Sequence, residues 1–203
     1  MKPRVGQVIV ALAFALIALG ANSQTGRKAL VVFPFGLGED VMEAKEYKLQ
    51  DELTKATHTL VKQDERFSAT LFARTHPSVK RALAEGSLKS ALLLEPFTGE
   101  VGGQPKSVIL GKLVRGQLAL AGLVESFEYD AVKKSARLVA SIELYDIVAA
   151  KMLGTVVLTA DALGETEADA ARAAVTKLAA EAVPQSVKIL TAPPKKDGGT
   201  PTR

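Results

Sequence analysis

The side chains that could do chemistry in this sequence are two histidines and scattered carboxylates, with no cysteine. His58 lies in an amphipathic segment and His76 precedes a proline, and neither belongs to the HExxH pattern that binds zinc. The lack of cysteine excludes disulfides, thiolate nucleophiles and Cys-ligated metal. GxSxG and SxxK, two common signatures of serine acyl transfer, are also missing. We therefore expect no catalytic residue, no metal site and no cofactor.

Gly36-Leu37-Gly38 stands between an apolar run and an amphipathic segment, where a phosphate-binding loop would lie. Val41 occupies the third glycine position of GxGxxG, and Glu39 and Asp40 would place negative charge where phosphate should bind. We interpret this stretch as a plain turn that leads into a helix cap.

The carboxylates are frequent but dispersed. A glycosidase needs two carboxyl groups roughly 5–10 Å apart across a cleft. On the first expected hairpin Glu125 should pair near Val139, whereas Glu143 should pair near residues 117–121, so these two are not direct neighbours. A periplasmic enzyme, or a small-ligand or glycan-binding protein that uses dispersed carboxylates, stays open as the alternative hypothesis.

Four residues suggest protein binding instead: Phe127, Tyr129, Arg137 and Tyr145. Aromatic rings and arginine are enriched at binding hot spots. In the expected sheet all four lie on one odd-numbered face, where they would suit a protein contact if exposed. The alternative is that they form ordinary cross-strand pairs or are covered by a helix.

These residues depend on three consecutive strands expected at 117–129, 136–145 and 152–162, joined by turns at 130–134 and 146–151. Pairing the first two strands about the first turn places even-numbered residues opposite even-numbered ones. The even-numbered face is then wholly apolar and must be covered, whereas the odd-numbered face is mixed and can meet water. The apolar face comprises Leu118, Leu120, Gly122, Val124, Leu138, Ala140, Ile142 and Leu144.

The fold class expected from the whole pattern is α/β (α+β), with a mainly antiparallel sheet flanked by helices. Before the three strands, the expected elements are a strand at 28–35, a helix at 41–62, a strand at 67–73, a helix from Pro77 to about Gly86, a strand or buried turn at 91–94, a loop at 96–103 and a helix from Pro105 to Gly116. After them, we expect a helix that is capped by Thr166 and Asp169 and ended by Pro184, and then a short edge strand at 187–190.

The N-terminus resembles a secretory signal peptide. Lys2 and Arg4 precede an apolar run at 8–19, and cleavage is expected between Ser23 and Gln24. The run is shorter than the roughly 20 residues that span a bilayer, so we expect no stable membrane anchor after signal removal; an uncleaved anchor is the alternative. The expected division is a signal peptide at 1–23, a single α/β domain at 24–190 and a disordered tail at 191–203.

After signal removal the basic and acidic residues are nearly balanced, which gives no electrostatic case for binding nucleic acid. We expect a protein that is periplasmic or secreted.

The order of these elements resembles the α/β domain shared by the TolB N-terminal domain, the curli secretion lipoprotein CsgG and the penicillin-binding-protein activator LpoB. In that group a strand passing through glycine precedes a strand ending in Asp, a Thr-Gly-Lys turn and a third strand. Gly122, Asp146 and Lys151 match those places, whereas Ala150 stands where the turn glycine is usual.

The resemblance implies a non-catalytic docking or assembly role in the bacterial envelope. The leading hypothesis is a soluble exported protein that is not an enzyme and binds another envelope protein. Self-association through an edge strand or the mixed face is a further possibility.

Overall fold

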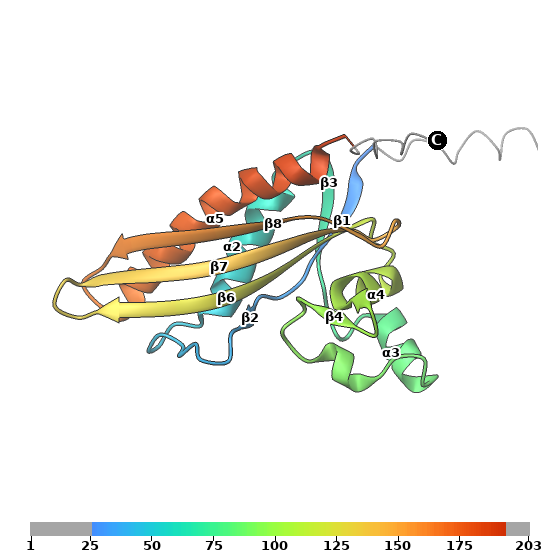
Figure 1. Cartoon of the computed structure of the whole chain (residues 1–203), viewed down its shortest axis with the longest axis horizontal. Coiled ribbons are helices and arrows are strands. Elements are labelled where there is room, and N and C mark those ends of the chain that lie inside the picture. The colour runs from blue at the N-terminus through green and yellow to red at the C-terminus, as the bar shows by residue number, and fades with distance from the viewer. Residues whose placement is uncertain (1–25, 194–203) are drawn as a thin grey trace, which may run out of the picture.

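A six-stranded mixed sheet organises residues 26–193, the part of the chain that the computed structural model describes (Figure 1). Five strands follow the order β3-β1-β6-β7-β8, and β2 pairs with β6 further along that strand. The expected signal peptide, its cleavage point at Ser23 and Gln24, and residues 194–203 lie outside the described part. Among residues 26–193, no helix is long and apolar enough to cross a membrane.

Strands β6 (Leu118–Asp130), β7 (Ser135–Asp146) and β8 (Lys151–Leu163) run back and forth as neighbours, each within a residue of its expected ends. Even-numbered residues of β6 and β7 pair with one another up to Val124 and Ala140. The even-numbered residues expected to face a core are all buried, which confirms the expected apolar side of this meander.

The other strand pairs of the six-stranded sheet are parallel, so the expectation of a mainly antiparallel sheet is inexact. β1 (Lys28–Val32) runs parallel to both β3 (Phe67–Leu71) and β6, and β2 (Gly36–Leu37), expected as part of a turn, also runs parallel to β6. A helix between β1 and β3 returns the chain to the start of the sheet, so that the two strands point the same way.

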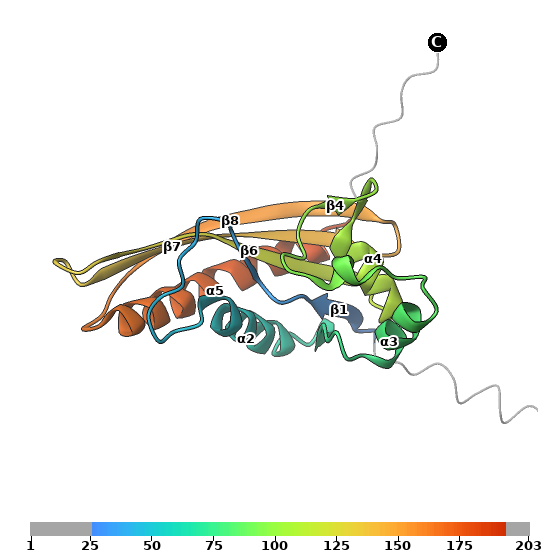
Figure 2. The same ribbon diagram turned by 90° about the horizontal axis from the view of Figure 1, so that it is seen from below.

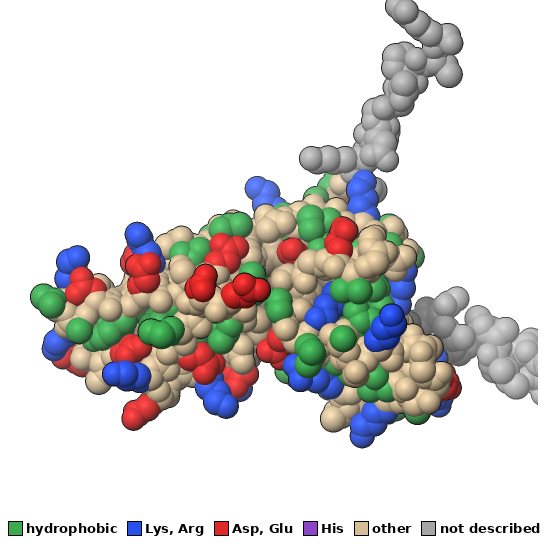
Figure 3. Space-filling view, turned by 60° about the horizontal axis from the view of Figure 1, so that its bottom comes forward, with side chains coloured by type: hydrophobic (Ala, Val, Ile, Leu, Met, Phe, Trp, Pro, Cys, Tyr) green, Lys and Arg blue, Asp and Glu red, His purple; other side chains and the backbone are tan. Residues whose placement is uncertain are grey.

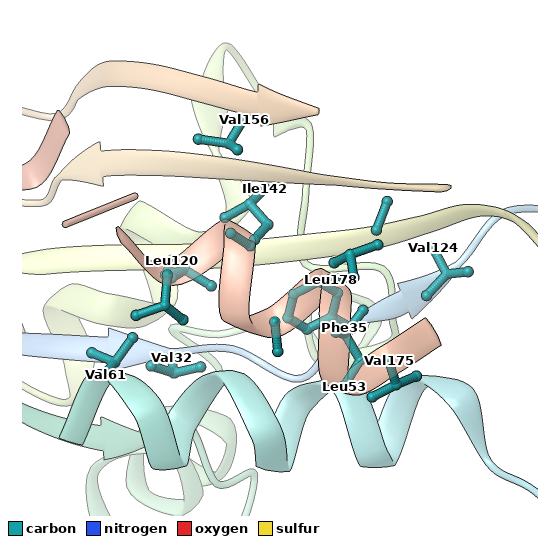
Figure 4. Packing of buried hydrophobic residues seen from close by; sticks show 14 of the residues in the cluster. Val32, Phe35, Leu53, Val61, Leu120, Val124, Ile142, Val156, Val175 and Leu178 are labelled. Atoms are coloured by element: carbon teal, nitrogen blue, oxygen red, sulfur yellow. The ribbon is translucent and has the colours of Figure 1, made fainter. Parts of the chain in front are cut away.

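The first core lies between the even-numbered face and helices α2 (Leu49–Lys62) and α5 (Glu167–Thr191), which form a second layer (Figure 2). Leu53 of α2 and Leu178 of α5 approach the sheet residues Leu120 and Ile142 there (Figure 4). This arrangement buries the apolar stripe of each helix against the sheet, which is what makes an amphipathic helix stable in a protein.

Helix α2 spans Leu49–Lys62, so the predicted start near Val41 is wrong. The chain after β2 first continues along β6, where the Gly38 amide donates a hydrogen bond to the Val124 carbonyl at 2.8 Å. Backbone pairing with the sheet therefore delays the helix, although the sequence after Val41 has helical periodicity.

Helix α5 spans Glu167–Thr191 and is capped by Thr166, whose Oγ1 accepts the Asp169 amide at 3.1 Å, as predicted. Pro184 lies inside this helix rather than ending it, and the strand expected at 187–190 is helical. Pro184 is exposed, so water can reach the carbonyl that its missing N–H leaves free. The expected tail thus begins too early, since α5 includes Thr191.

The opposite face of the sheet is covered only at one end (Figure 2). A second core forms there around three buried phenylalanines, with ring centres 4.7–5.4 Å apart: Phe33, Phe72 and Phe97. The segment expected as a strand or turn at 91–94 is a 3₁₀ turn, and the expected loop at 96–103 contains a small hairpin. The covering elements are α3 (Pro77–Ala84), the 3₁₀ turn (Ser90–Leu93), β4 (Glu100–Val101), β5 (Gln104–Pro105) and α4 (Lys106–Leu113).

Candidate interaction surface

A β-bulge in β6 separates the four residues predicted to form one surface. The pairing shifts between Val124 and Ser126, which leaves Glu125 as the extra residue. A one-residue shift turns every following side chain to the other face. Beyond the bulge, Phe127 pairs with Leu138, and Phe127 packs against the first core. The prediction that Phe127 lies on the odd-numbered face with Arg137 is therefore wrong.

Tyr129 follows Phe127 across the bulge, since it pairs with the buried Ala136. Arg137 pairs with Glu128 and stays on the opposite, exposed side, where its Nε donates to Asp161 Oδ1 at 2.9 Å. The four predicted residues are thus divided between the two faces of the sheet.

Tyr145 lies on the same face as Arg137 but is only 1% exposed, because the second core covers it. Its hydroxyl donates to Glu143 Oε2 at 2.8 Å, and the same oxygen accepts the Gly99 amide at 3.1 Å. Burial raises the pKa of Tyr145, and the hydrogen bond to Glu143 adds to the rise. Tyr145 and Glu143 therefore join the loop before β4 to the sheet.

A buried cation stabilises that loop from within. Lys106 Nζ donates to the carbonyls of Leu94 and Pro96, the latter at 2.8 Å, and lies 5.3 Å from the centre of the Phe97 ring. Burial lowers the pKa of Lys106. Because the chain itself supplies both carbonyls and the ring, we interpret Lys106 as a structural contact.

The uncovered part of the sheet forms an exposed surface on the side of Arg137, here named the open face. Cross-strand pairs place its members in three rows, because directly opposed residues share a face of the sheet. Val157 of β8 is 60% exposed, whereas Ser141 of β7 in the same row is 9% exposed. The rows are Leu123–Ser141–Val157, Ser126–Val139–Thr159 and Glu128–Arg137–Asp161.

The open face therefore combines an apolar and hydroxyl-bearing centre with a charged row near the turn between β6 and β7. Figure 3 shows hydrophobic and charged side chains mixed along the end of the molecule that the meander forms. Arg137 in the charged row is of a residue type that is enriched at protein interfaces.

Strand β8 also has a free edge, since it pairs only with β7 within the described residues. A second bulge lies between two cross-strand pairs of β7 and β8, Tyr145 with Met152 and Leu144 with Gly154. It leaves Leu153 of β8 as the extra residue. Met152 and Leu153 are both partly exposed there. The strand itself was predicted, but the expected edge strand was at 187–190, which is helical, so β8 forms the edge instead.

The bulge borders a hollow of about 930 Å³ between the turn after β7 and the end of α5. Its lining is mostly apolar, and within residues 26–193 the one carboxylate in it is Asp146, beside Lys151 and Lys188. Across residues 26–193, no three His, Cys, Asp or Glu side chains converge as a metal site would require. The hollow thus lacks the paired acids of a glycosidase.

No protein-family model and no curated protein matches this chain. Among solved structures, it is similar to the hypothetical protein CT253 from Chlamydia trachomatis, with a TM-score of 0.57 and 12% identity over 82% of this chain and 99% of that one. It is also similar to protein XCC0632 from Xanthomonas campestris, with a TM-score of 0.51 and 10% identity over 80% of this chain and 85% of that one. At these identities the similarity concerns the fold alone.

The LpoB C-terminal domain from Salmonella enterica matches with a TM-score of 0.42 and 13% identity, over 72% of this chain and 92% of that one. A score this low supports no conclusion about function. The resemblance to TolB, CsgG and LpoB therefore stays a prediction.

Proposed function

We propose that this protein is an exported, non-catalytic docking module of the bacterial envelope that binds another envelope protein through the open face. The observation that carries the proposal is an exposed sheet surface in a domain whose remaining sheet surfaces are covered by helices. Arg137, one of the predicted contact residues, belongs to this surface together with Val139 and Val157.

Two further features support the proposal. The signal-like N-terminus favours export to the periplasm or beyond. The hollow beside α5 offers a single carboxylate, which favours a binding role over acid–base chemistry.

The experiment is site-specific photocrosslinking in cells that express the full chain. A photoreactive amino acid at Val139, on the open face, should crosslink to one identifiable envelope protein, whereas the same group at Lys55, on the exposed side of α2, should not. The purified partner should then bind the wild-type protein and bind the Val139→Arg variant at least roughly tenfold more weakly.

Equal crosslinking from both positions, or no loss of binding in the Val139→Arg variant, would contradict the open face as the docking surface. Recovery of the protein in the cytoplasmic fraction alone would contradict export.

A further inference from the structure

We infer that the free edge of β8 pairs with the β8 edge of a second copy, in antiparallel orientation, with Val157 on the two-fold axis. This inference rests on the backbone and sequence of β8 and does not depend on the proposed docking of another protein. The segment involved, Gly154–Ala160, is here named the β8 edge.

The backbone of the β8 edge has donors and acceptors available for a partner. The Gly164 amide donates to the Lys134 carbonyl at 3.0 Å, which makes these two residues a hydrogen-bonded pair. Hydrogen-bonded and non-hydrogen-bonded pairs alternate along an antiparallel ladder. The pairing of β7 and β8 is regular from Leu163 back to Gly154, so residues 155, 157, 159 and 161 direct their N–H and C=O groups away from β7. Lys177 Nζ reaches the Asp161 carbonyl at 3.4 Å, as expected for an outward-facing group.

The sequence of the β8 edge is close to symmetric about Val157. Thr155 and Thr159 lie two residues on either side, Val156 and Leu158 one residue on either side, and the small residues Gly154 and Ala160 end the segment. In a two-fold interface residue i of one copy meets residue j of the other and j meets i, so this pattern places residues of the same kind opposite one another. Antiparallel pairing about Val157 would oppose Thr155 to Thr159 of the other copy, a favourable cross-strand pair, and would form about six backbone hydrogen bonds.

Charge favours the antiparallel orientation over the parallel one. Lys151 lies at the start of β8 and Asp161 near its end, and both are exposed. Antiparallel pairing brings Lys151 of one copy toward Asp161 of the other, whereas parallel pairing would bring like charges together.

The two features that end the β8 edge lie at equal distances from Val157 along the strand. The bulge at Leu153 interrupts regular pairing four residues before Val157, and Lys177 occupies the Asp161 carbonyl four residues after it. A partner strand therefore has one regular stretch to pair with, centred on Val157. Two exposed side chains of that stretch, Val157 and Thr159, belong to the open face, so the dimer would join two open faces into one surface.

The test is the oligomeric state of protein purified from cells that express the full chain, measured by light scattering over roughly 1–100 µM, the range of weak to moderate association. We expect a dimer in the wild type. Val157→Arg places two like charges on the axis and should weaken dimerisation roughly tenfold or more. Val132→Arg, at an even more exposed valine in the turn between β6 and β7, should leave it unchanged.

Single cysteines test the register without relying on a disruptive change, because the chain has no cysteine of its own. Opposed Cα atoms of a hydrogen-bonded pair lie about 5.5 Å apart, within the range of a disulfide. Val157→Cys should therefore form a disulfide-linked dimer on mild oxidation. Thr155→Cys should not, because the two Thr155 positions would lie about 13 Å apart along the strands.

A wild type that stays monomeric across that concentration range would overturn the inference. So would an intact dimer in the Val157→Arg variant, or crosslinking at position 155 as efficient as that at 157. None of these results bears on crosslinking of another protein from Val139.

Discussion

Gly122 of β6 packs directly against the ring of Phe35, in the segment after β1. A Cβ atom at this position would lie 2.1 Å from Cε1 of the Phe35 ring, which is fully buried. Any larger side chain would therefore have to displace a ring that packs in the first core. The strand glycine on which the family resemblance partly depends thus has a steric reason in this fold.

We predict that Gly122→Ala lowers the free energy of unfolding by about 1–3 kcal/mol, because the added methyl group overpacks the core. Urea unfolding followed by circular dichroism measures the change. Gly154→Ala is the matched control, since its Cβ would meet the Ile189 side chain at 3.2 Å or more. An unchanged unfolding midpoint for Gly122→Ala would show that Phe35 can move aside.

The contact between Tyr145 and Glu143 gives a pH-dependent prediction. We expect Tyr145→Phe to lower the free energy of unfolding by about 1 kcal/mol near neutral pH, through loss of the hydrogen bond to the carboxylate. The pKa of Tyr145 is raised above its ordinary value of 10.0 in the folded protein. The stabilisation by the neutral hydroxyl is therefore fully present below pH 10 and is lost as the pH rises toward the folded-state pKa.

Urea unfolding of both proteins between pH 7 and pH 11 measures this difference. The stability gap between wild type and Tyr145→Phe should shrink above pH 10. A gap that stays constant or widens there would contradict the prediction. Tyr129→Phe, at the half-buried far end of the same sheet, is the control.

The turn between β7 and β8 has a positive-φ backbone conformation that usually requires glycine, although the turn contains no glycine. Ala150 has a φ of +52°, in the left-handed region. It stands where the turn glycine is usual in the family that the sequence resembles. The Asp146 side chain supports the turn by accepting the Ala149 amide at 2.8 Å. The turn therefore holds Ala150 in a left-handed conformation, at the expense of strain against its Cβ atom.

We predict that Ala150→Gly stabilises the protein by about 1 kcal/mol, because glycine adopts positive φ without a steric penalty. This change should raise the melting temperature by roughly 2–4 °C, measured by calorimetry. Ala149→Gly, one residue earlier, should not stabilise the protein. An equal gain from both variants would contradict strain at Ala150 as the cause.

The elements that the sequence predicts well are those with a local signal. Alternating apolar residues identify β6, β7 and β8, and the pair Thr166 and Asp169 identifies the start of α5. The pairing of the parallel strands is harder to predict from the sequence, because their partners lie far away in the chain. Pro184 misleads because local chemistry argues for a helix end, whereas Val187 and Leu190 gain burial by continuing α5.

The faces on which the four expected contact residues lie were predicted less well, because these faces also depend on distant parts of the chain. A single bulge at Glu125 reverses the side on which Phe127 and Tyr129 lie, and no local pattern marks that bulge. Tyr145 is buried by elements from a different part of the chain. Arg137 stays on the exposed face because its strand, β7, is regular around it.

At the scale of the whole molecule, two cores lie on opposite faces of one sheet and differ in how their helices are attached. Helix α5 buries eleven of its residues, whereas α3 buries only Val79 and Ala82. Local opening is easiest where few apolar groups are buried. The elements around the second core should therefore open independently of the meander.

We predict that backbone amides in α3 exchange with solvent at least roughly tenfold faster than those in α5 and β7, because opening α3 exposes little apolar surface. Hydrogen–deuterium exchange followed by mass spectrometry resolves these segments. Equal protection of α3 and α5 would indicate that the two cores unfold as one cooperative unit.

Both ends of the described chain leave the sheet at the same end of the molecule (Figure 1). The amide of Ala29 donates to the side chain of Gln117, and Ala192 lines the hollow beside Asp146, whereas the turn at residues 131–134 lies a full strand length away, roughly 40 Å. An affinity tag inserted directly before Gly26 or after Pro193 would thus join the described chain at the opposite pole from that turn. Imaging and purification could then use such insertions while the turn at residues 131–134 stays accessible.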